Sequence, residues 1–220
     1  MGFKLDHFRL YDVQPYFSGA TPTLQGQFDG ADRPAVVGWL RQFANPVSKD
    51  GEAIQDRNSH FTIYDAQTTF PDPLRVVSVQ NQLGEQKLLI DHLLFLLVPA
   101  QKIEPGLEFP DTLDHYKGYR VFSGPVVDRK VSLVDQFQRQ DGVLVLEPLV
   151  FCVPVVKKYG GEVYEINNPQ DHLTIYRIVG NDFHTARDVK DQFFPNPIQL
   201  AIYSSQALAV PSLKLDWSLA

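Results

Sequence analysis

This 220-residue sequence has only one cysteine, no excess of positive charge and no long apolar run. The single cysteine, Cys152, excludes a framework of disulfide bonds within the chain. The chain has 20 Lys and Arg residues against 26 Asp and Glu residues, which gives a net charge of −6. Proteins that bind a phosphate backbone normally present a basic face. We therefore expect no nucleic acid among the partners of this chain.

We expect neither a membrane-spanning segment nor a signal peptide in this sequence. The longest apolar run, residues 88–100, is shorter than the roughly 20 residues that a helix needs to cross a bilayer, and it contains Asp91 and His92. The first residues contain no apolar signal core. The sequence predicts no membrane association and a location in the cytoplasm, with export and removal of a leader as the alternative.

Motifs that hold a cofactor or a metal ion are also missing. The sequence has no glycine-rich phosphate loop, no Gly-x-Ser-x-Gly elbow, no His-Glu-x-x-His and no Cys-x-x-Cys. We therefore expect neither a cofactor nor a metal site.

What the sequence does contain is a repeat. Three short patterns occur four times in the same order, at intervals of about 55 residues. The first is a histidine with a tyrosine four residues later, at His7 and Tyr11, His60 and Tyr64, His115 and Tyr119, and His172 and Tyr176. The second is a glutamine followed by Phe or Leu, at Gln27, Gln82, Gln136 and Gln192. The third is Pro-x-x-Lys, which ends at Lys49, Lys102, Lys157 and Lys214.

These patterns define four copies of one unit, residues 6–49, 59–102, 114–157 and 171–214. A proline-rich stretch, residues 104–110, separates the first pair of copies from the second. It divides the chain into pseudo-halves, residues 1–110 and 111–220. Apolar residues at 44% and charged residues at 21% are typical of a globular protein. We expect the halves to join in a single compact domain, residues 1–220.

Each copy has the composition of β-strands. In the first pattern, His and Tyr alternate with apolar neighbours at the period of two that is typical of a half-buried strand. The run before each Pro-x-x-Lys is rich in Val, Leu and Phe. No segment has apolar residues at the helical period of 3.6 over a long stretch together with helix-capping residues. We predict an all-β fold in which four tandem repeats of three to four strands form a pseudo-symmetric β-sandwich or barrel. A four-bladed β-propeller is the alternative, because the repeats have the size of blades.

The combined pattern of His-[Phe/Tyr/Leu]-x-x-Tyr, Gln-Phe and Val-Pro-x-x-Lys resembles a tandem repeat of uncharacterised bacterial proteins. The resemblance extends from Asp6 to Lys214. It implies an all-β repeat and no known activity.

The repeated residues are expected to serve the fold. Four equivalent histidines could in principle bind a metal ion, but we favour a structural role in which each bonds the backbone of a neighbouring loop. We expect the tyrosines to lie in the core and the glutamines to bond turn backbone. The lysines are interpreted as solvated edge or turn residues, and a ring of ammonium groups around an anionic ligand is the alternative.

Positions at which the copies differ are the candidates for a functional site. Seven residues before each proline of the third pattern stand Trp39, His92, Glu147 and Ser204. Ionisable groups inside apolar runs are costly unless they are paired or functional. If the fold brings these positions together, His92 and Glu147, with Asp91, are candidate catalytic acid/base groups. Trp39 and Ser204 are then candidate ligand-binding residues. The alternative is that all these positions mark strand ends exposed to water.

Two functions agree with this sequence. The favoured one is a non-catalytic β-repeat binding or structural module. The other is a small cofactor-independent enzyme, of the cyclase, isomerase or hydro-lyase type, with acid/base residues in a barrel mouth or inter-sheet cleft. In either case the partner is a small molecule or a protein, and the oligomeric state is left open.

Overall fold

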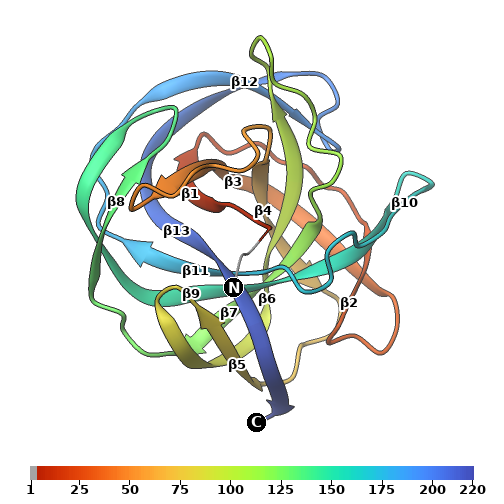
Figure 1. The fold of residues 1–220 in the computed structure, drawn as a ribbon. Coiled ribbons are helices and arrows are strands. Elements are labelled where there is room, and N and C mark those ends of the chain that lie inside the picture. The colour runs from red at the N-terminus through yellow and green to blue at the C-terminus, as the bar shows by residue number, and fades with distance from the viewer. Residues whose placement is uncertain (1–3) are drawn as a thin grey trace.

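Each repeat forms three β-strands in the structure, a computed structural model that describes residues 4–220 (Figure 1). The first strands are β1 (His7–Val13), β4 (His60–Thr68), β7 (His115–Ser123) and β11 (His172–Ile178). The second strands are β2 (Thr23–Gly26), β5 (Arg75–Asn81), β8 (Arg129–Val134) and β12 (Thr185–Asp191). The third and longest strands are β3 (Arg33–Lys49), β6 (Gly84–Lys102), β9 (Arg139–Tyr159) and β13 (Ile198–Leu219). A short strand, β10 (Glu162–Tyr164), follows the third repeat.

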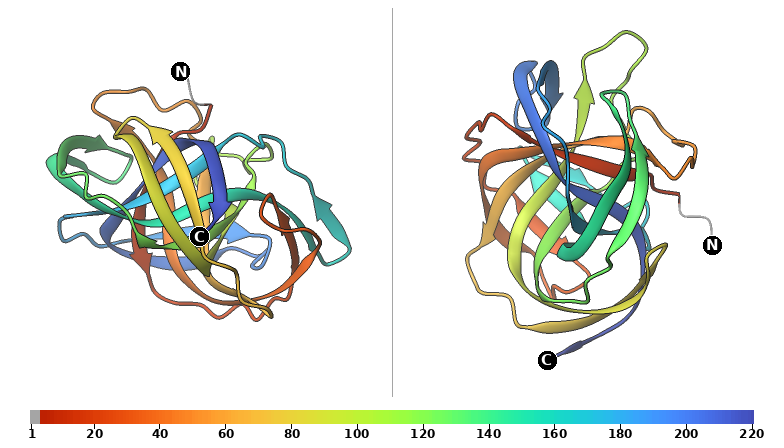
Figure 2. Two further views of the ribbon diagram at one scale, coloured as in Figure 1. Left: turned by 90° about the horizontal axis from the view of Figure 1, so that it is seen from below. Right: turned by 90° about the vertical axis from the view of Figure 1, so that its left-hand side faces the viewer.

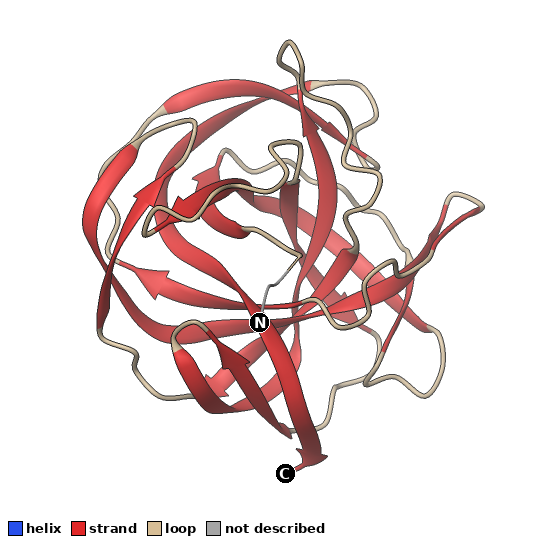
Figure 3. Cartoon of the chain, viewed as in Figure 1, coloured by secondary structure: helices blue, strands red, loops and turns tan. Residues whose placement is uncertain are grey.

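The prediction of an all-β fold is confirmed. Residues 4–220 contain strands, turns and loops but no helix (Figure 3). The part of the chain that the structure describes therefore holds no helix with the length and apolarity needed to cross a membrane. The repeated histidines begin the first strand of every repeat, so they occupy equivalent places as expected.

The first and third strands of all four repeats form one closed ring. Each third strand pairs antiparallel with the first strand of its own repeat and with that of the next, as β3 does with β1 and β4. The last strand, β13, pairs with β11 and with β1, which closes the ring in the order β1-β3-β4-β6-β7-β9-β11-β13. Bulges bend the long strands, so the ring is uneven and fits the predicted repeat sandwich. The propeller alternative is wrong, because a propeller keeps each blade in its own sheet.

The second strands connect repeats that lie opposite one another. β2 pairs with β9, β5 with β13, β8 with β3 and β12 with β6, so each second strand reaches the repeat two copies away. Figure 2 shows the long strands curving around the body, with the β9–β10 hairpin projecting from it. The repeats are thus interleaved rather than placed in a row.

The core has two layers, one on each face of the first strands. One layer lies inside the ring, and the other lies between the ring and the second strands. The residue after each repeated histidine belongs to one apolar cluster, which contains Phe8, Phe61, Tyr116 and Leu173. The four repeat tyrosines point the other way and are fully buried, which confirms that prediction. First strands are therefore covered on both faces, and they place their histidines at the buried edge of the ring.

Candidate functional site

The repeated histidine and glutamine meet at junctions between neighbouring repeats. The amide of Gln136 donates to Nε2 of His60 over 3.1 Å, and the amide nitrogen of Gln27 lies 2.5 Å from Nε2 of His172. Nδ1 of His60 lies 2.8 Å from the carbonyl oxygen of Asn58. The predicted backbone bond of the histidine is thus present. The predicted role of the glutamine was wrong, since it bonds side chains instead of turn backbone.

A carboxylate bridges the junction between the first and second repeats. The amide of Gln82 donates to both carboxylate oxygens of Glu52 at 2.8 Å. Nδ1 of His7 lies 3.8 Å from the same carboxylate. This junction also links its glutamine to its histidine, through Glu52.

The closing lysines lie at the same junctions and are mostly buried, which contradicts the expectation of solvated residues. Lys49, Lys102 and Lys157 are buried, and only Lys214 is partly exposed. Three ammonium groups lie over the phenylalanine that follows the glutamine of the next repeat: Lys214 over Phe28 at 5.5 Å, Lys102 over Phe137 at 5.5 Å and Lys157 over Phe193 at 4.7 Å. The expectation failed because it placed the lysine at a sheet edge, where the next repeat in fact supplies an aromatic cover.

The junction between the third and fourth repeats lacks the hydrogen bonds of the others. Within the described residues, the ring nitrogens of His115 have no hydrogen-bond partner. Oε1 of Gln192 and Nζ of Lys157 are buried, and neither has a partner within residues 4–220. We call this set, His115, Lys157 and Gln192, the open junction.

Burial controls the protonation of the open junction. It lowers the pKa of His115 well below its ordinary value, and the nearby Lys157 lowers it further, so the imidazole is neutral. Burial also lowers the pKa of Lys157 to about 7, and the Asp191 carboxylate offsets only part of this. The open junction therefore holds a neutral imidazole beside an amine that titrates near neutral pH.

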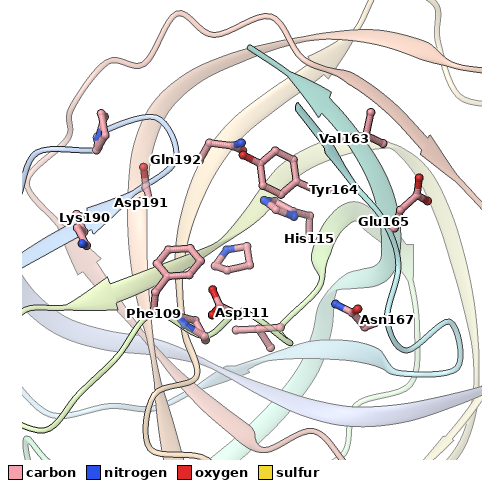
Figure 4. A pocket seen from close by; sticks show the side chains of 14 residues that line it. Phe109, Asp111, His115, Val163, Tyr164, Glu165, Asn167, Lys190, Asp191 and Gln192 are labelled. Carbon is pink, nitrogen blue, oxygen red and sulfur yellow. The ribbon is translucent and has the colours of Figure 1, made fainter. Parts of the chain in front are cut away.

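A pocket of about 520 Å³ opens onto this junction (Figure 4). His115, Tyr164 and Gln192 line it, and Figure 4 shows these three side chains side by side. The rings of His115 and Tyr164 are 5.2 Å apart. The exposed residues Asp111 and Glu165 also contribute to its wall. The pocket lining is part polar and part apolar. Prolines, Leu113 and Phe109 supply the apolar surface, and sites for small molecules usually combine such surface with a few polar groups.

The preceding junction carries an equivalent pocket of about 620 Å³, lined in part by Glu104, Asp135 and Gln136. Here Gln136 and Asp135 have partners. Gln136 is bonded to His60, and Asp135 accepts a hydrogen bond from the hydroxyl of Tyr11 at 2.7 Å. The two pockets have the same place in the repeat, but the one at the open junction is lined by Gln192, whose Oε1 has no hydrogen-bond partner within residues 4–220.

The residues singled out by symmetry breaking lie elsewhere, at bulges of the long strands. The pairing register shifts at all four equivalent positions, Trp39, His92, Glu147 and Ser204. A bulge leaves residues unpaired and turns them toward solvent, which explains why such different side chains are accommodated there. Nδ1 of His92 lies 3.0 Å from the carboxylate of Asp91, so those two neighbours do meet. Within residues 4–220, neither a hydrogen bond nor an ion pair joins His92 to Glu147.

Charged residues at the bulges have cross-strand partners. The guanidinium of Arg120 bonds the carboxylate of Asp91, and that of Arg177 donates to Glu147 at 2.6 Å. The catalytic roles of Asp91, His92 and Glu147 stay predictions.

The two uncharged bulge positions have contacts of a different kind. The ring of Trp39 packs on Phe17 with centroids 5.1 Å apart, and Oγ of Ser204 accepts from the backbone N–H of Phe183 at 3.2 Å. None of the three pockets described in residues 4–220 is lined by these residues. Their role in ligand binding likewise stays a prediction.

The sequence pattern identified His115, Lys157 and Gln192 as repeat residues. It did not show that they differ in their contacts from the equivalent residues of the other repeats. One signal was present: Lys157 is the closing lysine with no Asp or Glu among the three residues that follow it. Tyr164 lies between the third and fourth repeats, and no sequence pattern marks it as a candidate site residue. No group of three or more His, Cys, Asp and Glu side chains able to hold a metal ion occurs among residues 4–220.

Comparison with known proteins agrees with the repeat architecture. A family described as a repeat of unknown function (DUF7450) matches residues 54–211. No curated protein and no solved structure matches the chain. Because the match covers more than half of the sequence and includes three of the four histidine patterns, the chain belongs to this family of repeats of unknown function.

Proposed function

We propose that this chain is a non-catalytic binding module, and that its ligand site is the pocket at the open junction. The observation that carries the proposal is that Gln192 and Lys157 have buried polar atoms without partners, whereas Gln27 and Gln136 bond their histidines. A buried polar group without a hydrogen bond costs about 1–3 kcal/mol. A ligand that bonds these groups would recover that free energy on binding.

The size of the pocket supports a small molecule as the partner. Sites for small molecules usually have volumes of roughly 300–1,000 Å³ and combine apolar walls with a few polar groups. The pocket at the open junction, at about 520 Å³, falls in this range. A protein partner would instead need an extended surface of about 800 Å² on each side.

The enzyme alternative has less support. A carboxyl group acts as a general acid at neutral pH only when its pKa is raised. The hydrogen bond from Arg177 lowers the pKa of Glu147. His92 is about half exposed and pairs with Asp91. Both arrangements are ordinary for ion pairs on a protein surface.

The proposal is tested by a ligand-observed NMR screen of a small-metabolite library. Asp111→Trp places an indole on the exposed wall of the pocket, and Ala53→Trp does the same in the equivalent pocket. Compounds that bind the wild type should bind Ala53→Trp equally and should lose binding to Asp111→Trp. Binding that survives in Asp111→Trp, or a library without a single binder, contradicts the proposal.

A further inference from the structure

Other closing lysines have a carboxylate supplied by the residues just after them. Nζ of Lys49 lies 3.3 Å from the carboxylate of Asp50, and Nζ of Lys102 lies 2.9 Å from that of Glu104. Burial lowers the pKa of Lys214, and the carboxylate of Asp216 offsets part of this; the side chain is also partly exposed to water. Each of these lysines therefore has a counter-charge or solvent.

Lys157 has neither. Two residues after it, where Glu104 follows Lys102, stands Tyr159. Lys157 is fully buried, and within residues 4–220 no carboxylate lies in ion-pair distance of its Nζ. The ammonium group is covered instead by the rings of Tyr164 at 5.0 Å and Phe193 at 4.7 Å. Aromatic faces attract a cation but do not replace an anion in a buried site.

The carboxylate that acts on Lys157 through space, that of Asp191, is already engaged in hydrogen bonds. Oδ2 of Asp191 accepts from the hydroxyl of Tyr64 at 2.6 Å and from that of Thr62 at 2.5 Å. Oδ1 of Asp191 accepts from the backbone N–H groups of Phe193 and Phe194 at 2.7 and 2.9 Å. With both oxygens committed to the fold, Asp191 is not free to turn toward Lys157.

We propose that the ligand of the open junction is a small organic carboxylate whose carboxylate group becomes the missing counter-ion of Lys157, as Glu104 is for Lys102. This inference rests on the binding function proposed above. The amide of Gln192 and the ring of His115 supply further hydrogen bonds beside the same position.

The tyrosine on β10 separates the pocket from the ammonium group. Tyr164 lines the pocket and also lies over Nζ of Lys157, so its ring is the layer that a carboxylate displaces. Strand β10 has three residues and pairs with β9 alone in the described part of the chain, after a Gly160–Gly161 turn. A strand held on one side by so few hydrogen bonds moves at little cost in free energy.

The charged residues on the pocket wall restrict the charge that a ligand can carry. Asp111 and Glu165 are exposed there, and Lys190 lies on the same wall. Two carboxylates at the entrance repel a second negative charge on the ligand. The fitting ligand is thus a molecule with one carboxylate, whose outer end is neutral or positively charged.

The test compares benzoate with benzamide, its neutral isostere, by NMR titration of the full chain. Benzoate should bind the wild type at least about tenfold more tightly than benzamide. Lys157→Met keeps the apolar stem, and Tyr159→Glu supplies a carboxylate from the chain itself. Each should weaken benzoate at least about tenfold. Lys49→Met, at a junction that has its own carboxylates, should bind benzoate as the wild type does.

Two kinds of failure are distinguishable. If benzamide binds as well as benzoate, or if Lys157→Met binds benzoate normally, the carboxylate inference is overturned while the pocket stays a ligand site. If benzoate binds Asp111→Trp as tightly as the wild type, the location of the site, and with it the proposed function, is wrong. Absence of benzoate binding to the wild type also overturns the carboxylate inference.

Discussion

The side-chain amide of Gln136 reaches from the third repeat to Nε2 of His60 in the second, 3.1 Å away. On its other side, Nδ1 of His60 bonds the carbonyl of Asn58, which can only accept. Nδ1 therefore carries the hydrogen, and Nε2 is left to accept from the amide. This fixed neutral tautomer connects one repeat to the next, and any proton added to Nε2 breaks the connection.

Acid should therefore destabilise the protein in a defined pH range. Burial lowers the pKa values of His7, His60 and His172 to about 4, against an ordinary value of 6.5. Between pH 6.5 and about 4 the unfolded chain binds more protons, so stability is full above pH 6.5 and falls as the pH is lowered. The expected loss is about 1.4 kcal/mol per pH unit for each imidazole.

Urea unfolding at pH 7 and pH 5 measures this loss. A His60→Gln variant is the control, because it removes one titrating group and should show a shallower pH dependence. Equal unfolding midpoints at the two pH values would show that the histidines are not held neutral.

The two glutamines Gln136 and Gln192 should differ in their contribution to stability. Gln136→Met leaves Nε2 of His60 and the amide oxygen of Asn45 without their donor, which costs about 1–3 kcal/mol. Gln192→Met removes a group whose oxygen has no partner within residues 4–220, so it should cost less than about 0.5 kcal/mol. Chemical denaturation of the two variants makes the comparison. Equal losses would mean that the open junction is closed in solution.

Substitutions at the bulges should leave the fold intact. His92→Ala and Glu147→Gln remove exposed ion pairs, each worth less than about 1 kcal/mol. His60→Ala removes a buried ring that stacks on Phe43, and it should lower the melting temperature by many degrees. The measurement is the melting temperature of each of the three variants, compared with that of the wild type. If the bulge variants melt as early as His60→Ala, these residues are required by the fold.

We propose that all four repeats form a single compact domain, so that neither pseudo-half folds alone. In residues 1–110, β2 and β5 would lose their partners β9 and β13, and β1 would lose β13. Unpaired strands expose backbone groups that the full chain satisfies. A fragment of residues 1–110 should show no cooperative thermal transition by circular dichroism. A sharp transition in that fragment would show that the half is a domain of its own.

The fold could be predicted further from the sequence than the site could. Alternation around Tyr64 and its equivalents identified the first strands and their buried face, because burial at period two depends on local sequence alone. The lysines were misplaced because the aromatic ring that covers Lys157, Phe193, comes from the next repeat. The difference between Gln192 and Gln136 depends on contacts across a junction, which spacing along the chain does not specify. Symmetry breaking pointed to positions that lie at bulges, where different side chains are tolerated.

The protonation of Lys157 tests the central claim most directly, because the open junction is defined by a buried ammonium group without a counter-ion. An NMR titration that follows the lysine side-chain nitrogens, with Lys157→Arg to assign the signal, gives its pKa. We predict a midpoint near 7 in the wild type, since burial lowers the pKa of Lys157 to about 7. In Tyr159→Glu the midpoint should rise toward the ordinary value near 10.5, because the new carboxylate favours the charged form. A wild-type midpoint already near 10.5 would contradict the account, since it would mean that Lys157 is paired or solvated in the folded protein.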